Sequence, residues 1–476
     1  MWLVGSSWCS TNEMLRNLTM ERVTISRRAF LSGGAAAFGS LFGGRLLAAP
    51  PGWKHGGSPI LVFGVISDTH LRTSVKGEGH GANWPDKYLV AALKHFKTQN
   101  VDAVVHCGDM AHRGQVREME FHAEAWSRVF GGVAKGPARL FITGNHDAEG
   151  AYYEDFVKNR YPDEAERAKH VLATDMAANW ERIWGEKYEP VWHREIKGHH
   201  FFGRNWGVDE QEAIRALNGW KPGDGTGRPF FYLQHCRPSG DIRRALMRHE
   251  GAVAFFGHNH CSIANWNMAY LYGGRLPVLE CASCEPRGCR ELRDDAWVTK
   301  AELEGRENVG SARQGYVVRV YDDMVVFERR EFGEGGVLGA DWVMPLGKRD
   351  PHPFSKDELK KVIGEPQFRK GAKLTIVKGS ASQRLCVKIP LADGNPDSRV
   401  YAYEVEVAGD DASKKLLKAV YAAGCNMGIG HEPNKGVTTL EIPKSELPPG
   451  KAFTIAVRPL SSLGTSGKPI VAEFKV

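Results

Sequence analysis

The sequence predicts an α/β region followed by a separate all-β region. Between about residues 58 and 345, short apolar runs alternate with stretches of helical pattern, which indicates a sheet covered by helices. After about residue 345, strand-like runs follow one another with turn residues between them, and helical periodicity is mostly absent. A chain of 476 residues also exceeds an ordinary single core, so two domains are expected.

The α/β region contains a regular series of expected elements. Apolar runs predict strands at 61–66, 101–107, 139–143, 230–233 and 252–256, and a hairpin that joins 315–321 to 324–331. Helical patterns lie at 85–99, 115–130 and 241–250. The polar stretches 150–190 and 284–313 are expected to be insertions or loops.

The all-β region is expected to be a β-sandwich of short strands. The strand-like runs lie at 374–377, 385–389, 400–407, 416–421, 438–442, 453–457 and 470–476. The stretch 447–457 (LPPGKAFTIAV), with Leu463 and Gly464 after it, resembles a fibronectin type III domain, with Phe453 where that family usually has Tyr. We therefore expect domains at 56–345 and 367–476, joined by a charged linker at 346–366 that contains Pro and Gly.

The N-terminus carries a paired-arginine motif. Arg27 and Arg28 are followed by Ala-Phe-Leu, a glycine-rich apolar run and Arg45, which resembles a twin-arginine export signal. The other interpretation is a chance arginine pair before a buried helix. Since the apolar run is short, no stable membrane span is expected. The resemblance implies a signal at 1–49, with Met20 as a possible true start, and a periplasmic or secreted protein.

Composition and cysteine content limit the class of protein. With 42% hydrophobic and 25% charged residues the chain is globular, and a net charge of +7 without a basic stripe does not favour nucleic acid as a partner. The sequence does not indicate an oligomeric state. Export would permit disulfides, both between Cys386 and Cys425 and among the remaining candidates. Those candidates are Cys261, Cys281, Cys284 and Cys289, of which Cys281 and Cys284 also have the spacing of a zinc knuckle.

Five short motifs follow the ends of predicted strands. Their polar residues are Asp68 and His70, Asp109, Asn145 and His146, His235, and His258 and His260. Singly, each has an ordinary explanation, since Asp often caps a turn and a lone His is usually just hydrogen-bonded. Together they would meet at one edge of the sheet, because open α/β sheets bind ligands at the carboxyl ends of their strands. Such a mixed nitrogen and oxygen set suits Mn, Fe or Zn.

The order and spacing DxH, GD, GNHD, H and GHxH resemble the calcineurin-like metallophosphoesterase family. The resemblance implies a β-sandwich core flanked by helices and a pair of divalent or trivalent metal ions. Asp68, His70 and His260 would hold one ion, and Asn145, His235 and His258 the other. Asp109 would bridge the two ions. His146 would not bind metal and would face the substrate as general acid or phosphate stabiliser. In an extended chain the i, i+2 spacing of His258 and His260 would let each reach a different ion.

The resemblance also implies hydrolysis of a phosphate mono- or diester, whether a small molecule, a sugar phosphate or a lipid head group. Two ions roughly 3.5–4 Å apart neutralise the phosphate and acidify a bridging water, which becomes the attacking hydroxide. The alternative is a catalytically silent metal-binding protein that uses its β-sandwich to bind glycan or cell envelope. The presence of His146 and of all seven ligands argues against that alternative.

Residues 108–114 (GDMAHRG) resemble the GDxxDRG block of protein phosphatases. In that block the Arg contacts phosphate, so Arg113 is a candidate phosphate clamp by bidentate hydrogen bonding; the other interpretation is a solvated loop residue. The chain departs from the block at His112, where the Asp that supports the catalytic histidine normally stands. Asp147, next to His146, is a candidate to take its place.

Overall fold

The computed structural model describes residues 57–72, 86–149, 158–220, 228–285, 288–290, 303–347, 350–379, 383–394, 399–411, 414–431 and 436–475. The predicted export signal at 1–49 lies outside these residues.

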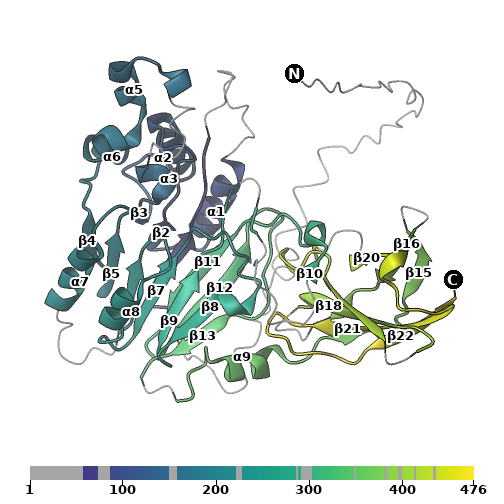
Figure 1. Ribbon diagram of the computed structural model, residues 1–476. Coiled ribbons are helices and arrows are strands. Elements are labelled where there is room, and N and C mark those ends of the chain that lie inside the picture. Colours follow the sequence, from purple (N-terminus) through teal and green to yellow (C-terminus); the bar gives the residue numbers. More distant parts are fainter. Residues whose placement is uncertain are drawn as a thin grey trace, which may run out of the picture. The chain divides into compact units, whose positions relative to one another are not determined.

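A six-stranded mixed sheet begins the α/β region (Figure 1). Its order is β13 (Trp342–Pro345), β12 (Met324–Glu331), β11 (Gln314–Val320), β1 (Leu61–Ile66), β2 (Ala103–Cys107) and β3 (Ala138–Ile142). β1, β2 and β3 run parallel, whereas β11 and β12 form the predicted antiparallel hairpin. The carboxyl ends of β1, β2 and β3 therefore lie at the same edge.

A second six-stranded sheet follows in the chain. Its order is β4 (Val191–Ile196), β5 (His199–Arg204), β6 (Phe230–Leu233), β7 (Ala252–Phe256), β9 (Leu276–Glu280) and β8 (Ala269–Tyr272). β5, β6, β7 and β9 are parallel, while β4 and β8 are antiparallel edge strands. The expected strands β6 and β7 have the predicted bounds, but β4, β5, β8 and β9 were not predicted. β4 carries exposed residues at 193–195, so it lacks the apolar run on which strand prediction depends.

The two sheets share one hydrophobic core and carry helices on their other faces. Phe63 of β1 lies 4.8 Å from Phe231 of β6, measured between ring centroids, and both belong to this shared core. α1 (Lys87–Thr98) and α2 (Val116–Phe130) pack against the first sheet, while α7 (Glu210–Gly219) and α8 (Gly240–Leu246) pack against the second (Figure 1). Gly64 lets the ring of Phe96 approach β1, because a Cβ there would lie 2.6 Å from that ring. The mixed α/β prediction is confirmed.

Two stretches that the sequence predicts as loop or linker contain helices. Residues 150–190 include α5 (Glu164–His170) and α6 (Met176–Trp184), and residues 346–366 include α9 (Lys356–Ile363). α6 buries Trp180 and Trp184, and α9 buries Leu359 and Ile363. These few apolar residues are spaced four apart, as on one face of a helix, but the charged residues around them obscure this periodicity in the sequence. The helices are therefore evident only from the packing of these residues in the structure.

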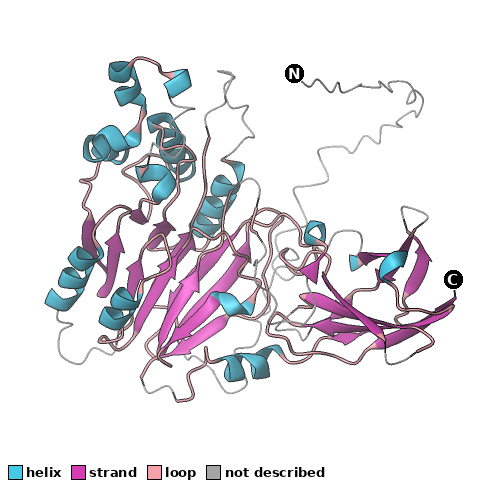
Figure 2. Ribbon diagram, in the orientation of Figure 1, coloured by secondary structure: helices cyan, strands magenta, loops and turns pink. Residues whose placement is uncertain are grey.

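All seven strands predicted after residue 373 are present (Figure 2). One sheet has the order β10 (Leu303–Glu304), β19 (Lys415–Tyr421), β18 (Ala402–Ala408), β21 (Ala452–Leu460) and β22 (Ile470–Lys475). Another has the order β15 (Thr375–Lys378), β16 (Arg384–Ile389) and β20 (Thr438–Pro443), and β14 (Gln367–Phe368) pairs with β17 (Ala392–Asp393). Buried residues of the two larger sheets, such as Val405 and Val387, belong to one hydrophobic cluster.

None of the cysteines in the described part of the chain is paired. All eight that follow residue 49 are free, so the candidate disulfides are absent from the structure. Cys107 and Cys281 come close, with 3.6 Å between their sulfur atoms, and both are fully buried. Among the described helices, none combines the length and apolarity needed to cross a bilayer.

Candidate metal centre

The five motifs meet at the carboxyl edges of the two sheets. The loops that carry them follow β1, β2, β3, β6 and β7, and α3 (Asn145–Ala148) begins within the third. Among the described residues, three groups of histidine and aspartate place their ligand atoms within 4.8 Å of one another. The groups are Asp68, His70 and His260; Asp109, His235 and His258; and His70, His112 and His146.

The first group is buried and tightly spaced. Nε2 of His260 lies 3.0 Å from Oδ1 of Asp68 and 3.0 Å from Nε2 of His70. Two imidazole nitrogens that bind the same tetrahedral ion at about 2.0–2.1 Å stand roughly 3.4 Å apart. The separation in this group is close to that value, so these three side chains fit one ion.

The second group is also tightly spaced, although His258 is exposed, and the amide oxygen of Asn145 lies beside it. Nε2 of His235 lies 3.0 Å from Oδ1 of Asn145, and Nδ1 of His258 lies 3.1 Å from the same oxygen. The two imidazole nitrogens are 3.3 Å apart. The ring of Trp206, which the sequence did not single out, stacks on His258 with 6.2 Å between centroids. It therefore borders the accessible side of this group.

Asp109 belongs to the second group and also approaches the first. Its Oδ2 is 3.1 Å from Nε2 of His235 and 3.5 Å from Nε2 of His70. Its Oδ1 accepts a hydrogen bond of 2.9 Å from the backbone N–H of His146. One carboxylate thus reaches both groups and also holds the first residues of α3, which carries the predicted general acid.

The backbone at this edge is strained. Five of the predicted metal ligands have left-handed φ values: Asp68 (53°), His70 (44°), Asp109 (57°), His258 (72°) and His260 (58°). Each such residue costs about 1–3 kcal/mol, and such strain clusters at functional sites. The prediction of an extended chain at His258 and His260 is therefore wrong. The two residues nevertheless face different groups, because the left-handed turn separates their side chains.

Two glycines make room for the carboxylates. A Cβ on Gly144 would collide with Oδ1 of Asp109, and a Cβ on Gly257 would collide with Oδ2 of Asp68. Both glycines belong to motifs of the predicted site. Their role is to let the backbone approach the carboxylates closely.

Charges in the site are coupled. Burial alone would raise the pKa of Asp109, but His235 outweighs it and lowers that pKa to about 2. Burial likewise opposes the charge of His235, yet Asp109 raises its pKa to about 10. His260 has a pKa raised to about 9 by Asp68, again against the effect of burial. Two carboxylates thus hold two histidines protonated, and bound metal ions would take the place of those protons.

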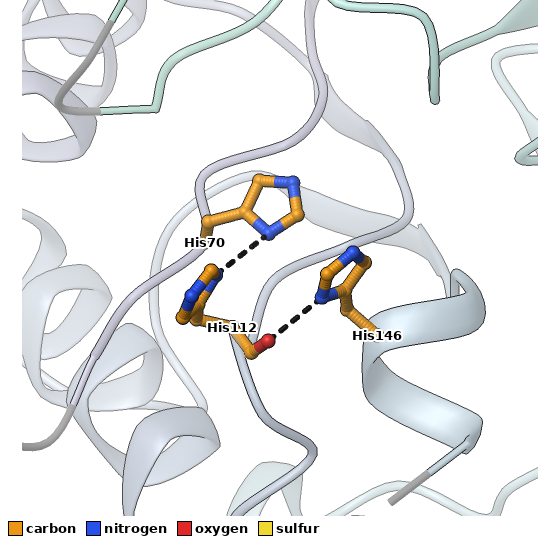
Figure 3. Close-up of side chains that lie close together, drawn as sticks. All are labelled: His70, His112 and His146. Atoms are coloured by element: carbon orange, nitrogen blue, oxygen red, sulfur yellow. Dashed lines mark hydrogen bonds between the residues drawn. The ribbon is translucent and has the colours of Figure 1, made fainter. Parts of the chain in front are cut away.

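His146 is supported by a backbone carbonyl instead of a carboxylate. Its Nδ1 donates a hydrogen bond of 2.7 Å to the carbonyl oxygen of His112 (Figure 3). Asp147 points elsewhere, since its carboxylate accepts from the backbone N–H groups of Gly144, Met110 and Ala111 at 2.9, 3.2 and 2.7 Å. Asp147 therefore ties two site loops together, and the suggestion that it supports the His146 side chain is wrong.

Glu285 is a further residue that the sequence did not reveal. Its Oε2 lies 3.1 Å from Nδ1 of His260, and its Oε1 accepts a 2.8 Å hydrogen bond from Arg72. Carboxylates commonly orient metal-binding histidines in this way through the nitrogen that does not bind the ion. Glu285 lies at the end of the stretch 281–285 that follows β9, and only the fold brings it to His260.

Arg113 is fixed through its backbone. Its N–H donates a 2.7 Å hydrogen bond to Oε2 of Glu118, which also accepts from the backbone of Gln115 at the start of α2. Arg113 thus follows the site loop that contains Asp109 and His112. Its role as a phosphate clamp stays a prediction.

Comparison with known proteins indicates the family of the α/β region. Residues 61–262 match the calcineurin-like phosphoesterase family. The fold is similar to a dimetal phosphatase from Danio rerio, at 11% identity over 61% of this chain and 100% of that chain, with a TM-score of 0.34. It is also similar to the purple acid phosphatase PPD1 from yellow lupin (Lupinus luteus) seeds, at 12% identity over 62% and 55% of the two chains, with a TM-score of 0.42. No curated protein matches the chain.

Residues 61–262 therefore form a calcineurin-like metallophosphoesterase domain. All the predicted metal ligands, His146 and Arg113 lie within it, whereas Glu285 lies beyond the matched residues. Members of this family are phosphoester hydrolases that depend on two metal ions.

Proposed function

We propose that this protein hydrolyses phosphate mono- or diesters at a centre of two metal ions. The observation that carries the proposal is the position of Asp109, whose Oδ2 lies 3.1 Å from His235 and 3.5 Å from His70. A carboxylate between two histidine groups is suited to bridge two cations, since its negative charge offsets their repulsion. The same centre would not need such a bridge if it held only one ion.

Each ion would have its own ligands. Asp68, His70 and His260 would hold one, Asn145, His235 and His258 the other, and Asp109 both. The mixed imidazole and oxygen donors favour Mn, Fe or Zn. When bound, a pair of such ions neutralises phosphate oxygens and lowers the pKa of bound water, which supplies a nucleophile near neutral pH.

His146 would act on the leaving group. Its Nδ1 donates to the His112 carbonyl, so Nε2 is the nitrogen that would carry a proton to the departing oxygen. General acid catalysis of this kind contributes roughly 10²–10⁴-fold to the rate. Arg113, on the loop after Asp109, would contact a phosphate oxygen, and Trp206 beside His258 would border the ester's organic group.

The proposal is tested with metal-depleted full-length protein reloaded separately with Mn²⁺, Fe²⁺ or Zn²⁺. An aryl phosphate monoester and an aryl phosphate diester are supplied, and release of the phenol is followed. Turnover of at least one ester, lost on chelation and restored by metal, is the expected result. Metal-loaded protein that hydrolyses neither ester would overturn the proposal. If an ester is hydrolysed, a screen of sugar phosphates and phospholipid head groups would define the substrate.

We also propose that the C-terminal β region is a fibronectin type III-like domain. A third proposal is that the chain is exported through its paired arginines. A reporter fused after residue 55 should leave the cytoplasm when it is folded. Replacing Arg27 and Arg28 together by lysine should retain it there. Equal export of both fusions would refute the signal.

A further inference from the structure

We propose that His70, His112 and His146 form a third metal site, separate from the two ions of the proposed function. The ligand nitrogens of these three histidines lie within 4.8 Å of one another. Figure 3 shows the side chains of His70, His112 and His146 facing one another, with His146 at the start of α3. His70 also belongs to the first group, because its Nε2 lies 3.0 Å from Nε2 of His260. The site would take a transition-metal ion such as Zn²⁺.

His70 can serve two ions because its two nitrogens point in different directions. Its Nε2 faces His260 at 3.0 Å, whereas its Nδ1 lies 3.5 Å from Nδ1 of His112. Two imidazoles on one tetrahedral ion place their nitrogens roughly 3.4 Å apart, which matches the second distance. Binding at Nδ1 would release the proton of that nitrogen to solvent, so His70 would bridge the first and third ions.

His146 is prepared to act as the third ligand. Because Nδ1 donates to the His112 carbonyl, Nε2 is the nitrogen that would bind an ion. Histidine ligands of metals commonly donate their other N–H to a backbone carbonyl, which fixes the ring. The His146 ring lies 4.6 Å from the His70 ring and 5.6 Å from the His112 ring, measured between centroids. Small rotations would bring the three nitrogens onto one ion.

The donor set decides which ions would bind. Three imidazoles without a carboxylate suit Zn²⁺, Cu²⁺ or Ni²⁺ and do not suit Mg²⁺ or Ca²⁺, which prefer oxygen ligands. His112 completes the set, and it stands where the GDxxDRG block has Asp. The third site is therefore a property of this chain's own departure from that block.

An ion at this site would inhibit the reaction proposed above. His146 cannot donate a proton while its Nε2 binds a metal, so excess Zn²⁺ should reduce turnover after the first two ions have raised it. This consequence rests on the proposed function. The number of ions bound does not rest on it.

The experiment counts bound Zn²⁺ after equilibrium dialysis, with metal analysis of the protein. All variants carry His200→Ala in addition. Nε2 of His193 and Nδ1 of His200 lie 2.9 Å apart, so this pair could bind a further ion on the surface. We expect three ions per chain in this background. Adding His112→Ala or His112→Gln should leave two. His112→Gln keeps a polar side chain beside His70. If this variant also binds one ion fewer, the loss of the ion is not due to a missing hydrogen bond.

Cobalt supplies a second readout. The third equivalent of Co²⁺ should produce visible absorption of a tetrahedral site, and His112→Ala should lack it while its circular dichroism matches that of the parent. Two ions in the parent, or three in both His112 variants, would overturn the third site. If three ions bind but no ester is hydrolysed, the proposed function fails and the third site stands.

Discussion

The carbonyl oxygen of His112 accepts a 2.7 Å hydrogen bond from Nδ1 of His146. A backbone carbonyl accepts a hydrogen bond but carries no negative charge, so it orients the ring without the electrostatic support of a carboxylate. Burial, in addition, lowers the pKa of His146. The general acid of this protein is therefore positioned by geometry more than by charge.

Replacing His146 should separate catalysis from metal binding. In His146→Ala we expect kcat to fall by roughly 10²–10⁴-fold, because the leaving oxygen loses its proton donor. The content of the two proposed ions should not change, since His146 belongs to neither of their groups. Turnover of an aryl phosphate and metal analysis are the measurements, with the exposed His431→Ala as control. Normal turnover would show that His146 is not the acid.

Asp109→Ala should remove both ions. The side chain lies within 3.5 Å of a histidine from each group, and without it each ion loses a ligand and the charge that holds the pair together. Metal analysis after dialysis is the measurement. Asp322→Asn, at an exposed position, is the control and should keep both ions. Two retained ions in Asp109→Ala would contradict the bridge.

Glu285→Gln should weaken the ion held by His260. The carboxylate lies 3.1 Å from Nδ1 of that histidine, and loss of such a partner typically costs 10–100-fold in metal affinity. Competition with a chromogenic chelator measures the affinity. Arg290→Gln removes a charge 4.0 Å from Glu285 but leaves its contact with His260, so it should have little effect. Equal affinities for Glu285→Gln and the parent would refute the role of Glu285.

Burial of His122 should lower the free energy of unfolding at acidic pH. It is fully buried on α2, and burial holds its pKa well below 6.5. Below pH 6.5 the unfolded chain binds a proton that the folded chain does not, so the free energy of unfolding falls as the pH falls and is constant above. Between pH 7 and pH 5 this group contributes a loss of about 2 kcal/mol.

Urea unfolding of metal-free protein tests this. His122→Leu should show a smaller loss of stability between pH 7 and pH 5 than the parent, by about 2 kcal/mol. Part of the loss should persist, because burial also lowers the pKa of the neighbouring His106, to about 3. The exposed control His431→Leu should behave like the parent. Parallel pH dependence of His122→Leu and the parent would contradict the assignment.

Strands were predicted well where an apolar run ends in a turn. β1, β6 and β7 have the predicted bounds, because their residues are buried on both faces and leave a continuous apolar run in the sequence. β4 and α6 were missed because exposed and charged side chains interrupt their apolar pattern. Their few apolar residues, such as Trp184, can be recognised as core residues only once the tertiary structure shows the cluster in which they are buried.

The sequence by itself determined the five motifs, their order, and the likeness to a metallophosphoesterase, because residue type and spacing are local properties of the chain. The tertiary structure decided which atoms face one another. It brought Glu285 to His260, turned Asp147 toward the backbone of its neighbouring loop, and placed the His112 carbonyl behind His146. These contacts depend on left-handed turns and on loops distant in sequence, whose positions follow from the packing of two sheets and not from any single motif.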